Sequence, residues 1–408
     1  MHRQTRLLLA RAAGRAVSTL SRRLGLGAGG TIGGRVLLKV APTAVSALAR
    51  DRDVVLVSGT NGKTTTSALL ATALRSSMPT DTNTDGANTP AGLAHTLSMG
   101  NASTVVLETD EGWLPWAVEQ TRPGTVVLLN LSRDQLHRHH EVGRLAAIWR
   151  EAMTQVDLVV ANADDPDVVW AALASRRQLW VSAGQHWVQD DNVCPRCGQQ
   201  CLHAHGSWSC SCGLRRPEPD WWIEGAELVS GTSRVPLGLS LPGDFNQANA
   251  AMAAAAAWSR GVHPQDAVRH MRRVSTVAGR YAIREYHGRS TRLLLAKNPA
   301  GWLETINMVA PHRGPLVLAF NSDGVDGRDP SWLYDVPFQR LSGRRIIVVG
   351  RRATDLLVRL EMDGLAGVGR ARSVAAALVS LPTGPVDVIA NYTAFQDARR
   401  ELSRAERH

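Results

Sequence analysis

Short apolar, β-branched runs alternate with helix-like stretches along most of the chain. Strands that alternate with helices form a parallel sheet covered by helices on both faces, so this pattern predicts an α/β fold. The strand-like runs fall into two groups: Val54–Val57, Thr104–Leu107, Val126–Leu129 and Leu158–Val160, then Leu293–Leu295, Leu316–Phe320, Ile346–Val349 and Val386–Ile389. A chain of 408 residues is long enough for two or three domains.

We therefore divide the chain into a helical lead-in at 1–50, a first α/β domain at 51–280 and a C-terminal α/β domain at 281–408. The lead-in alternates arginine with apolar residues and is broken by glycines between residues 25 and 34. We expect it to pack on the first domain; a helix lying on a membrane surface is the less favoured alternative. Ligands of parallel sheets sit at the carboxyl ends of the strands, so the polar residues after each strand are the candidates for chemistry.

The stretch after the first run, Gly59-Thr60-Asn61-Gly62-Lys63-Thr64-Thr65, leads from a strand into a helix and matches most of a phosphate-binding loop. Backbone N–H groups of such a loop point at anionic oxygens. Lys63 is expected to reach the β- and γ-phosphates of ATP, and the Thr64 hydroxyl is expected to bind Mg²⁺. The general pattern has a glycine where this chain has Val57, so a plain strand-to-helix turn is the competing interpretation. The flanking strand, helix and threonines favour nucleotide binding.

Carboxylates follow several of the strands in the first group. Glu108 stands directly at a strand end, beside the loop, where Mg²⁺ needs hard oxygen ligands, so we predict it to be a metal ligand. For Asp110 and Glu111, metal binding and helix capping are equally favoured. The Asp164-Asp165-Pro166 stretch is interpreted as a turn with a capping carboxylate.

All five cysteines lie between residues 192 and 215, and we interpret this region, about 190–216, as an inserted zinc ribbon. Paired cysteines on glycine-containing knuckles are typical of structural zinc sites. The predicted zinc ligands are Cys194, Cys197, Cys210 and Cys212. Cys201 is left open as a fifth ligand. A disulfide interpretation is weak because the chain has no export signal.

The formal net charge is +10, with a pI near 10.1, and nearly all basic residues are arginines. Such a surface suits nucleic acid, anionic lipid or an anionic substrate, but a GC-rich genome explains the bias equally well. Lysine occurs only as Lys39, Lys63 and Lys297, so a lysine kept in a glycine-rich loop indicates a need for a compact ammonium. No apolar run is long enough to span a membrane and no signal-peptide core is found, so we expect a cytoplasmic protein.

Two further segments have both a structural and a chemical interpretation. Asn246 and Asn249 lie near the start of an alanine-rich helix, where capping is the simple role. Asp329, followed by Pro330, is a good helix N-cap, and from the residues alone capping is the favoured role for it.

The chain resembles the Mur ligase superfamily, and within it the synthetase subunits of lipid II isoglutaminyl synthases. The resemblance rests on Gly59–Thr66, Asp85–Asn88, Glu108–Gly112, Arg133–Gln135, Asn162–Pro166, the cysteine ribbon, Gly243–Asn249, Lys297–Gly301, Asp326–Asp335 and Asn391–Thr393. It implies a Mur-ligase-like central ATPase domain with a parallel sheet and a zinc-ribbon insertion, followed by a C-terminal α/β domain. It also implies that Asn246 and Asn249 contact the nucleotide base.

The function that the resemblance implies is that of an ATP-dependent amide ligase of peptidoglycan synthesis. Such an enzyme amidates the α-carboxylate of D-glutamate in the lipid II stem peptide to D-isoglutamine, at the inner face of the cell membrane. ATP and Mg²⁺ serve to phosphorylate the carboxylate, and ammonia attacks the acyl phosphate. A GatD-type glutaminase subunit, held in a heterodimer, supplies the ammonia, and no nucleic-acid partner is expected.

By motif position, the resemblance makes Asp329 the acid that completes the Cys–His pair of the glutaminase partner, which reverses the preference for capping. The lack of any cysteine outside the ribbon agrees with a nucleophile in another chain. The chain departs from the family's pattern at His137 and Ser322, where aspartate is usual. Two alternatives stay open: a Mur-like amino-acid ligase of the folylpolyglutamate synthetase kind, and a non-catalytic zinc-ribbon protein that binds nucleic acid.

Overall fold

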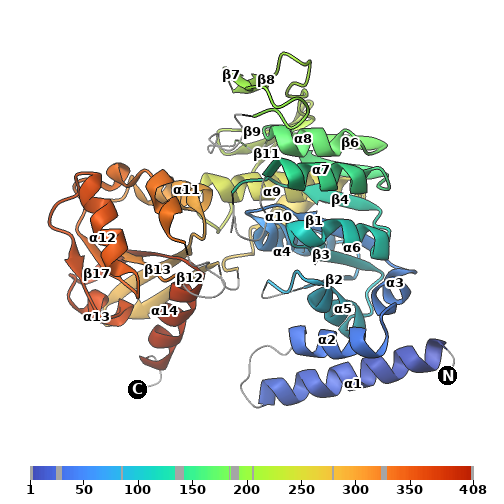
Figure 1. Cartoon of the computed structure of the whole chain (residues 1–408), viewed down its shortest axis with the longest axis horizontal. Helices are drawn as coiled ribbons and strands as arrows, with labels where there is room; N and C mark the ends of the chain where they lie inside the picture. Colours follow the sequence, from blue (N-terminus) through green and yellow to red (C-terminus); the bar gives the residue numbers. More distant parts are fainter. Residues whose placement is uncertain are drawn as a thin grey trace. The chain divides into compact units, whose positions relative to one another are not determined.

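The computed structural model describes residues 3–23, 30–83, 86–133, 142–182, 184, 193–204, 206–277, 280–322 and 329–405. The chain folds into two units, each with its own sheet (Figure 1). The first contains residues 1–132, 141–241 and 245–275, and the second contains 133–140, 242–244 and 276–408. No helix among the described residues is both long enough and apolar enough to cross a bilayer.

The first unit is built on a nine-stranded sheet with the order β11-β10-β9-β6-β5-β4-β1-β3-β2. All neighbouring pairs in the part of the sheet from β9 to β2, in the order just given, are parallel. Strands β10 and β11 extend the sheet beyond β9 as antiparallel strands. The strands are β1 (Asp53–Ser58), β2 (Thr80–Thr82), β3 (Thr104–Glu108), β4 (Thr125–Leu128), β5 (Leu158–Asn162), β6 (Arg177–Ser182), β9 (Trp221–Glu224), β10 (Glu227–Ser230) and β11 (Ser233–Pro236). The four predicted runs are its central strands.

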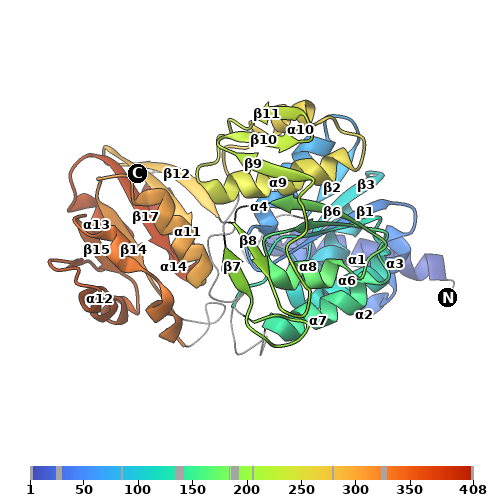
Figure 2. The same cartoon turned by 90° about the horizontal axis from the view of Figure 1, so that it is seen from above.

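Helices cover both faces of this sheet, which explains why its central strands are continuously apolar (Figure 2). The helices are α1 (Arg3–Arg23), α2 (Gly30–Val40), α3 (Ala44–Ala49), α4 (Lys63–Leu74), α5 (Pro90–Met99), α6 (Leu114–Thr121), α7 (Val142–Met153), α8 (Pro166–Ala172), α9 (Asp244–Trp258) and α10 (Pro264–Met271), with a short η1 (Glu111–Trp113). One face carries α6, α7 and α8; the other carries α4, α9 and α10.

The order of the strands fixes where a ligand can bind. β1 lies between β3 and β4, so the chain leaves it toward one side of the sheet and later returns to the other side. Such a reversal opens a crevice at the carboxyl end of the central strand. The loop at residues 59–62 lies at this point.

The second unit is built on a six-stranded sheet with the order β12-β13-β17-β14-β15-β16. Its strands are β12 (Tyr281–Tyr286), β13 (Arg289–Leu295), β14 (Leu316–Ala319), β15 (Ile346–Val349), β16 (Gly369–Arg370) and β17 (Gly384–Ala390). Its helices are α11 (Pro299–Val309), η3 (Ser331–Asp335), η4 (Phe338–Leu341), α12 (Ala353–Met362), α13 (Val374–Val379) and α14 (Tyr392–Ala405). Two apolar cores, one on each face, confirm the predicted second α/β fold.

Candidate nucleotide-binding site and cysteine cluster

The loop after β1 depends on two glycines for its shape. Gly59 and Gly62 have positive φ angles of 152° and 86°, a region that L side chains rarely adopt. A Cβ at Gly59 would lie 2.8 Å from the Cβ of Leu129, and one at Gly62 would lie 2.3 Å from Oδ1 of Asn249. The close approach of neighbouring groups therefore requires glycine at both positions.

The residues after β4 hold the middle of the loop. The backbone N–H of Asn61 donates to Oδ1 of Asn130 (2.9 Å), and Nδ2 of Asn130 donates to the Asn61 carbonyl (3.1 Å). The Thr60 hydroxyl accepts from the backbone N–H of Ser132 (3.0 Å). Asn130 and Ser132 thus hold Thr60 and Asn61 in place by hydrogen bonds, a role that we did not predict from the sequence.

Lys63 begins α4 and is buried. Its Nζ donates to the carbonyls of Gly59 and Thr60, the latter at 3.3 Å, and to Oε2 of Glu111 at 2.9 Å. Burial by itself lowers the pKa of Lys63, but the buried Glu111 and Glu108 outweigh it and the pKa is raised. Lys63 is therefore a fixed ammonium at the carboxyl end of β1, which is what binding a phosphate requires.

The carboxylate of Glu108 lies buried at the end of β3, as expected for a residue at the strand end. Its Oε1 accepts from the neutral amide of Asn88 (3.1 Å), while Asn83 bonds both its backbone N–H and its carbonyl. Glu108 and Glu111 bring two buried carboxylates to one buried ammonium, so the cluster carries excess negative charge. Together with the Thr64 hydroxyl, it offers the hard oxygen donors that suit a divalent cation.

The structure brings the start of α9 against the loop. Oδ1 of Asn249 accepts from the Thr66 hydroxyl (3.2 Å), and Nδ2 of Asn249 donates to Oδ1 of Asn246 (3.3 Å). Both asparagines are buried. Asn246 and Asn249 therefore belong to the same site as the loop, and they are more than caps of their own helix.

The remaining carboxylates after the strands have structural partners. Asp110 accepts from the backbone N–H of Gly112 (3.1 Å) and caps η1. Asp165 caps α8 and also accepts from the backbone N–H of Leu131 (2.7 Å). Asp164 accepts from Nε of Arg216 at 2.8 Å. The capping interpretation was thus right for Asp110 and Asp165, whereas Glu111 pairs with the loop lysine.

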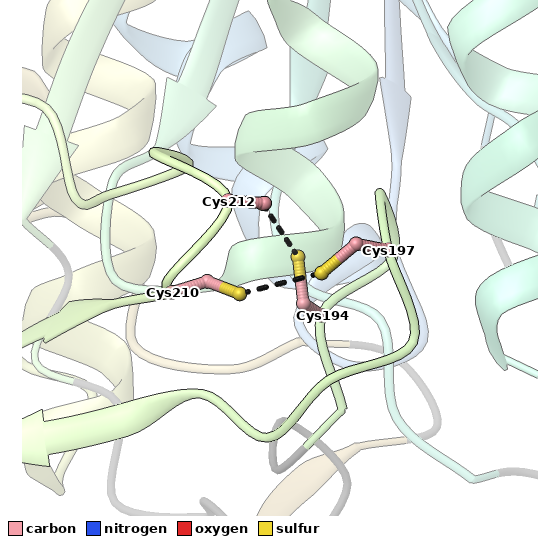
Figure 3. A group of neighbouring side chains, drawn as sticks. All are labelled: Cys194, Cys197, Cys210 and Cys212. Carbon is pink, nitrogen blue, oxygen red and sulfur yellow. Dashed lines mark hydrogen bonds between the residues drawn. The ribbon is translucent and has the colours of Figure 1, made fainter.

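Four cysteine sulfurs form a compact cluster in the inserted module (Figure 3). Their Sγ atoms all lie within 4.8 Å of one another, with Cys194 and Cys212 3.7 Å apart and Cys197 and Cys210 3.5 Å apart. Tetrahedral zinc with bonds of about 2.3 Å sets its sulfurs about 3.8 Å apart, so these four residues fit a zinc ion. The predicted ligand set is the one that the structure brings together.

Cys201 is buried but is not part of this cluster; it packs with Trp208 and with Val169 of α8. Burial raises the pKa of the Cys194 thiol. The pKa of Cys210 is lowered to about 6, chiefly because the backbone N–H of Cys212 donates to its sulfur. This hydrogen bond favours the thiolate form of Cys210, which is the form that binds zinc.

The module, with its short strands β7 (Leu202–Ala204) and β8 (Ser207–Ser209), is anchored to the sheet of the first unit. Nε1 of Trp208 donates to the carbonyl of Ala163 (3.0 Å), just after β5, and Arg216 pairs with the adjacent Asp164. Both side chains of this ion pair are largely buried. A zinc ion here would hold the ribbon on the strand end that carries Asp164 and Asp165.

Asp329 lies in the second unit and is exposed. Its Oδ1 accepts from the backbone N–H of Ser331 (2.9 Å), and this bond holds the pKa of Asp329 below its ordinary value. The side chain therefore stabilises the turn that leads into η3, and its carboxylate remains accessible to solvent. Asp85, Asp134, Gln135, His137 and residues 326–328 lie outside the described residues, while Ser322 is half-buried after β14.

The central strand of this parallel sheet is followed by a glycine-containing loop, and then by a lysine and a threonine at the start of a helix. This arrangement is typical of nucleotide-binding domains of the phosphate-loop class. The Mur ligase middle domain family matches residues 57–257, and the MurT ligase C-terminal family matches residues 295–395. These two matches make the chain similar to the Mur ligases over its middle part and to the MurT ligases over its C-terminal part.

Individual relatives agree over most of the chain. It is 29% identical over 390 residues to the MurT subunit of lipid II isoglutaminyl synthase (glutamine-hydrolyzing) of Staphylococcus aureus strain N315, covering 89% of this chain and 88% of that protein. It is 28% identical over 372 residues to the MurT subunit of Streptococcus pneumoniae strain R6, covering 83% of each. The fold is similar to that of a pseudomurein peptide ligase type C from Methanothermus fervidus, with a TM-score of 0.66, 19% identity and coverage of 86% and 78%.

Proposed function

We propose that this chain is the synthetase subunit of a glutamine-dependent amidotransferase that converts D-glutamate in the lipid II stem peptide to D-isoglutamine. The observation that carries the proposal is the similarity, along nine-tenths of the chain, to relatives named as MurT subunits of lipid II isoglutaminyl synthase. It is supported by the buried cluster of Lys63, Glu108 and Glu111 at the switch point of the first sheet. The reaction is an ATP-dependent ligation in which the α-carboxylate is activated as an acyl phosphate.

Each residue of the cluster has a role in this reaction. The ammonium of Lys63 neutralises phosphate oxygens, and Asn246 and Asn249 border the nucleotide. Thr64 and Glu108 would hold Mg²⁺, which stabilises charge on the transferred phosphoryl group. Because Lys63, Glu108 and Glu111 are buried, their charges act in a medium of low effective dielectric and interact strongly.

The ammonia is proposed to come from a GatD-type glutaminase held in a heterodimer with this chain. Asp329 would orient the histidine of the partner's Cys–His pair, as a carboxylate does in a catalytic triad. Its exposure leaves the carboxylate accessible to another chain. Its pKa lies below the ordinary 3.8, so Asp329 is ionised throughout the neutral range, and glutamine-driven activity should not titrate with it above about pH 5.

Asp329→Asn tests this assignment in the complex of both subunits, with lipid II, ATP and either glutamine or ammonium chloride. We expect glutamine-driven product to fall by about two to four orders of magnitude. Ammonium-driven product should stay near the wild-type level. Asp355→Asn, a control at a half-buried aspartate in the first turn of α12, should retain both activities.

Lys63→Ala should abolish product from both nitrogen sources, because it acts at the ATP site. If Asp329→Asn works equally well with glutamine and ammonium, Asp329 serves only to cap η3. If the wild-type chain needs no glutaminase and instead joins a free amino acid to its substrate, it is a Mur-like amino-acid ligase of the folylpolyglutamate synthetase kind. The enzyme is proposed to act at the cytoplasmic face of the membrane, where a lipid-linked substrate is available.

A further inference from the structure

Helix α1 has an apolar face that points away from the protein. Leu8, Leu9 and Leu20 are exposed by 65%, 54% and 57%, and Ala12 and Ala16 are exposed between them. At 100° per residue these five positions fall on one side of the helix. A soluble helix usually buries such a stripe, so its outward direction is unexpected.

The opposite side of α1 packs against other helices of the first unit. Ala10, Gly14 and Ser18 are buried against α2, and a Cβ on Gly33 would lie only 2.6 Å from the Gly14 carbonyl. Two arginines of α1, Arg11 and Arg15, donate to the carbonyl of Ser98 in α5, at 2.9 and 2.8 Å. Among the described residues of the first unit, no element covers the outer side (Figure 1).

The charge of the chain is concentrated in the same segment. Residues 1–50 contain no aspartate or glutamate and nine basic residues, so almost all of the net charge of +10 resides there. The nine are Arg3, Arg6, Arg11, Arg15, Arg22, Arg23, Arg35, Lys39 and Arg50. Burial, followed by the nearby Arg15 and Arg52, lowers the pKa of Arg11.

The second helix also exposes an apolar side chain and basic side chains. On α2, Ile32, Arg35 and Lys39 are exposed at helical spacing, so an apolar side chain is again followed by cations. Met99, at the end of α5, is exposed beside the carbonyl that binds Arg11 and Arg15. We call the exposed side chains Leu8, Leu9, Leu20, Ile32, Arg35 and Lys39 the N-terminal face.

We propose that the N-terminal face docks on an anionic lipid bilayer, with α1 lying in the plane of the interface. A helix with an apolar stripe and a basic border inserts its apolar side chains below the headgroups while its cations contact the anionic lipids. A second copy of the chain is a poor occupant, because two such faces would repel each other. Bilayer binding by this face depends only on the charge and shape of the segment, whether or not the substrate is lipid II.

Vesicle flotation of the full chain tests the proposal. Vesicles of phosphatidylglycerol and phosphatidylcholine should bind the chain, pure phosphatidylcholine should bind it weakly, and added salt should release it. The triple variant Leu8→Ser, Leu9→Ser, Leu20→Ser should bind about a hundredfold less, because three leucines no longer enter the bilayer. A matched control changes three exposed apolar residues elsewhere, Leu173→Ser, Val358→Ser and Val379→Ser, and should bind as the wild type does.

The double variant Arg35→Gln, Lys39→Gln tests the electrostatic part at positions that are exposed on α2. We expect a loss of about fivefold per charge with anionic vesicles and little change with neutral ones. Equal binding by the leucine variant and the control would overturn the proposal. So would sedimentation showing that the wild type is a dimer and the leucine variant a monomer, or loss of the glutaminase subunit from the leucine variant, since the face would then be a protein interface.

Discussion

At the scale of single residues, the buried pair of Lys63 and Glu111 is the least expected feature of the loop. The two side chains are 2.9 Å apart and almost fully buried, although 48 positions separate them in the sequence. Nε1 of Trp149 donates to the Glu111 carbonyl (2.9 Å) and so helps to fix the segment that presents this carboxylate. A phosphate that reaches Lys63 must compete with Glu111 for the same ammonium.

Glu111→Gln should lower the free energy of unfolding by about 3 kcal/mol, because it removes the carboxylate that is hydrogen-bonded to a buried ammonium and leaves only Glu108 to offset its charge. A non-hydrolysable ATP analogue should recover much of this loss, since its phosphates supply the missing negative charge. The nucleotide-induced rise in melting temperature should therefore be larger for the variant than for the wild type.

Thermal unfolding with and without the analogue measures both effects. Glu119→Gln, at an exposed position on the neighbouring α6, is the control and should change neither quantity. A variant that is destabilised yet gains no more from the nucleotide than the wild type does would show that Glu111 and the phosphates do not share Lys63.

At the scale of elements, the cysteine ribbon is tied into the strand ends that support the loop. Arg216 of the ribbon pairs with Asp164, and the next residue, Asp165, accepts from the backbone of Leu131. Leu131 in turn precedes Ser132, whose backbone N–H donates to Thr60 in the loop. These contacts are continuous from the ribbon to the loop, so the ribbon is a support for the site.

The metal content of cysteine variants tests the ribbon. The wild type should contain one zinc ion per chain, and Cys210→Ser should contain close to none, with a lower melting temperature because metal binding stabilises the fold of the ribbon. Cys201→Ser is the matched control, since Cys201 is buried in the same module but is not in the cluster. Elemental analysis showing equal zinc loss in both variants would contradict the four-cysteine assignment.

At the scale of the whole molecule, the chain has two units with separate sheets and separate apolar cores. Each sheet ends in polar residues at the carboxyl ends of its strands. In the second unit, Asn321 and Asn391, which follow β14 and β17, bond each other, and Nδ2 of Asn321 donates to Asp397 (3.2 Å). Two separate cores give each unit the means to fold as its own cooperative body.

Calorimetry of the full chain should accordingly show two unfolding transitions. The loop belongs to the first unit, so a non-hydrolysable ATP analogue should shift the transition of that unit by the equivalent of about 2.7 kcal/mol at a hundred times its dissociation constant. Lys63→Ala should show the same two transitions without that shift. A single transition, or an equal shift of both in the wild type, would mean that the units unfold together.

The sequence by itself determined the features that depend on local pattern. The apolar runs predicted the central strands of both sheets, because a strand buried on both faces must be apolar throughout. The glycines around Lys63 and the spacing of the cysteines predicted a phosphate loop and a metal cluster, because both require particular residue types close together in the chain. The class of protein was therefore predictable from the sequence, and the family followed from its motifs.

Only the tertiary structure decided which distant residues meet. Pairing of Glu111 with Lys63, and of Asn249 with Thr66 across 183 positions, follows from the order of the strands and the placement of α9. Cys201 lies outside the group of four sulfurs although it is buried in the same module, and α1 contacts α2 closely at Gly14 while its leucines stay exposed. Such contacts depend on the three-dimensional path of the chain, and no local period or spacing records them.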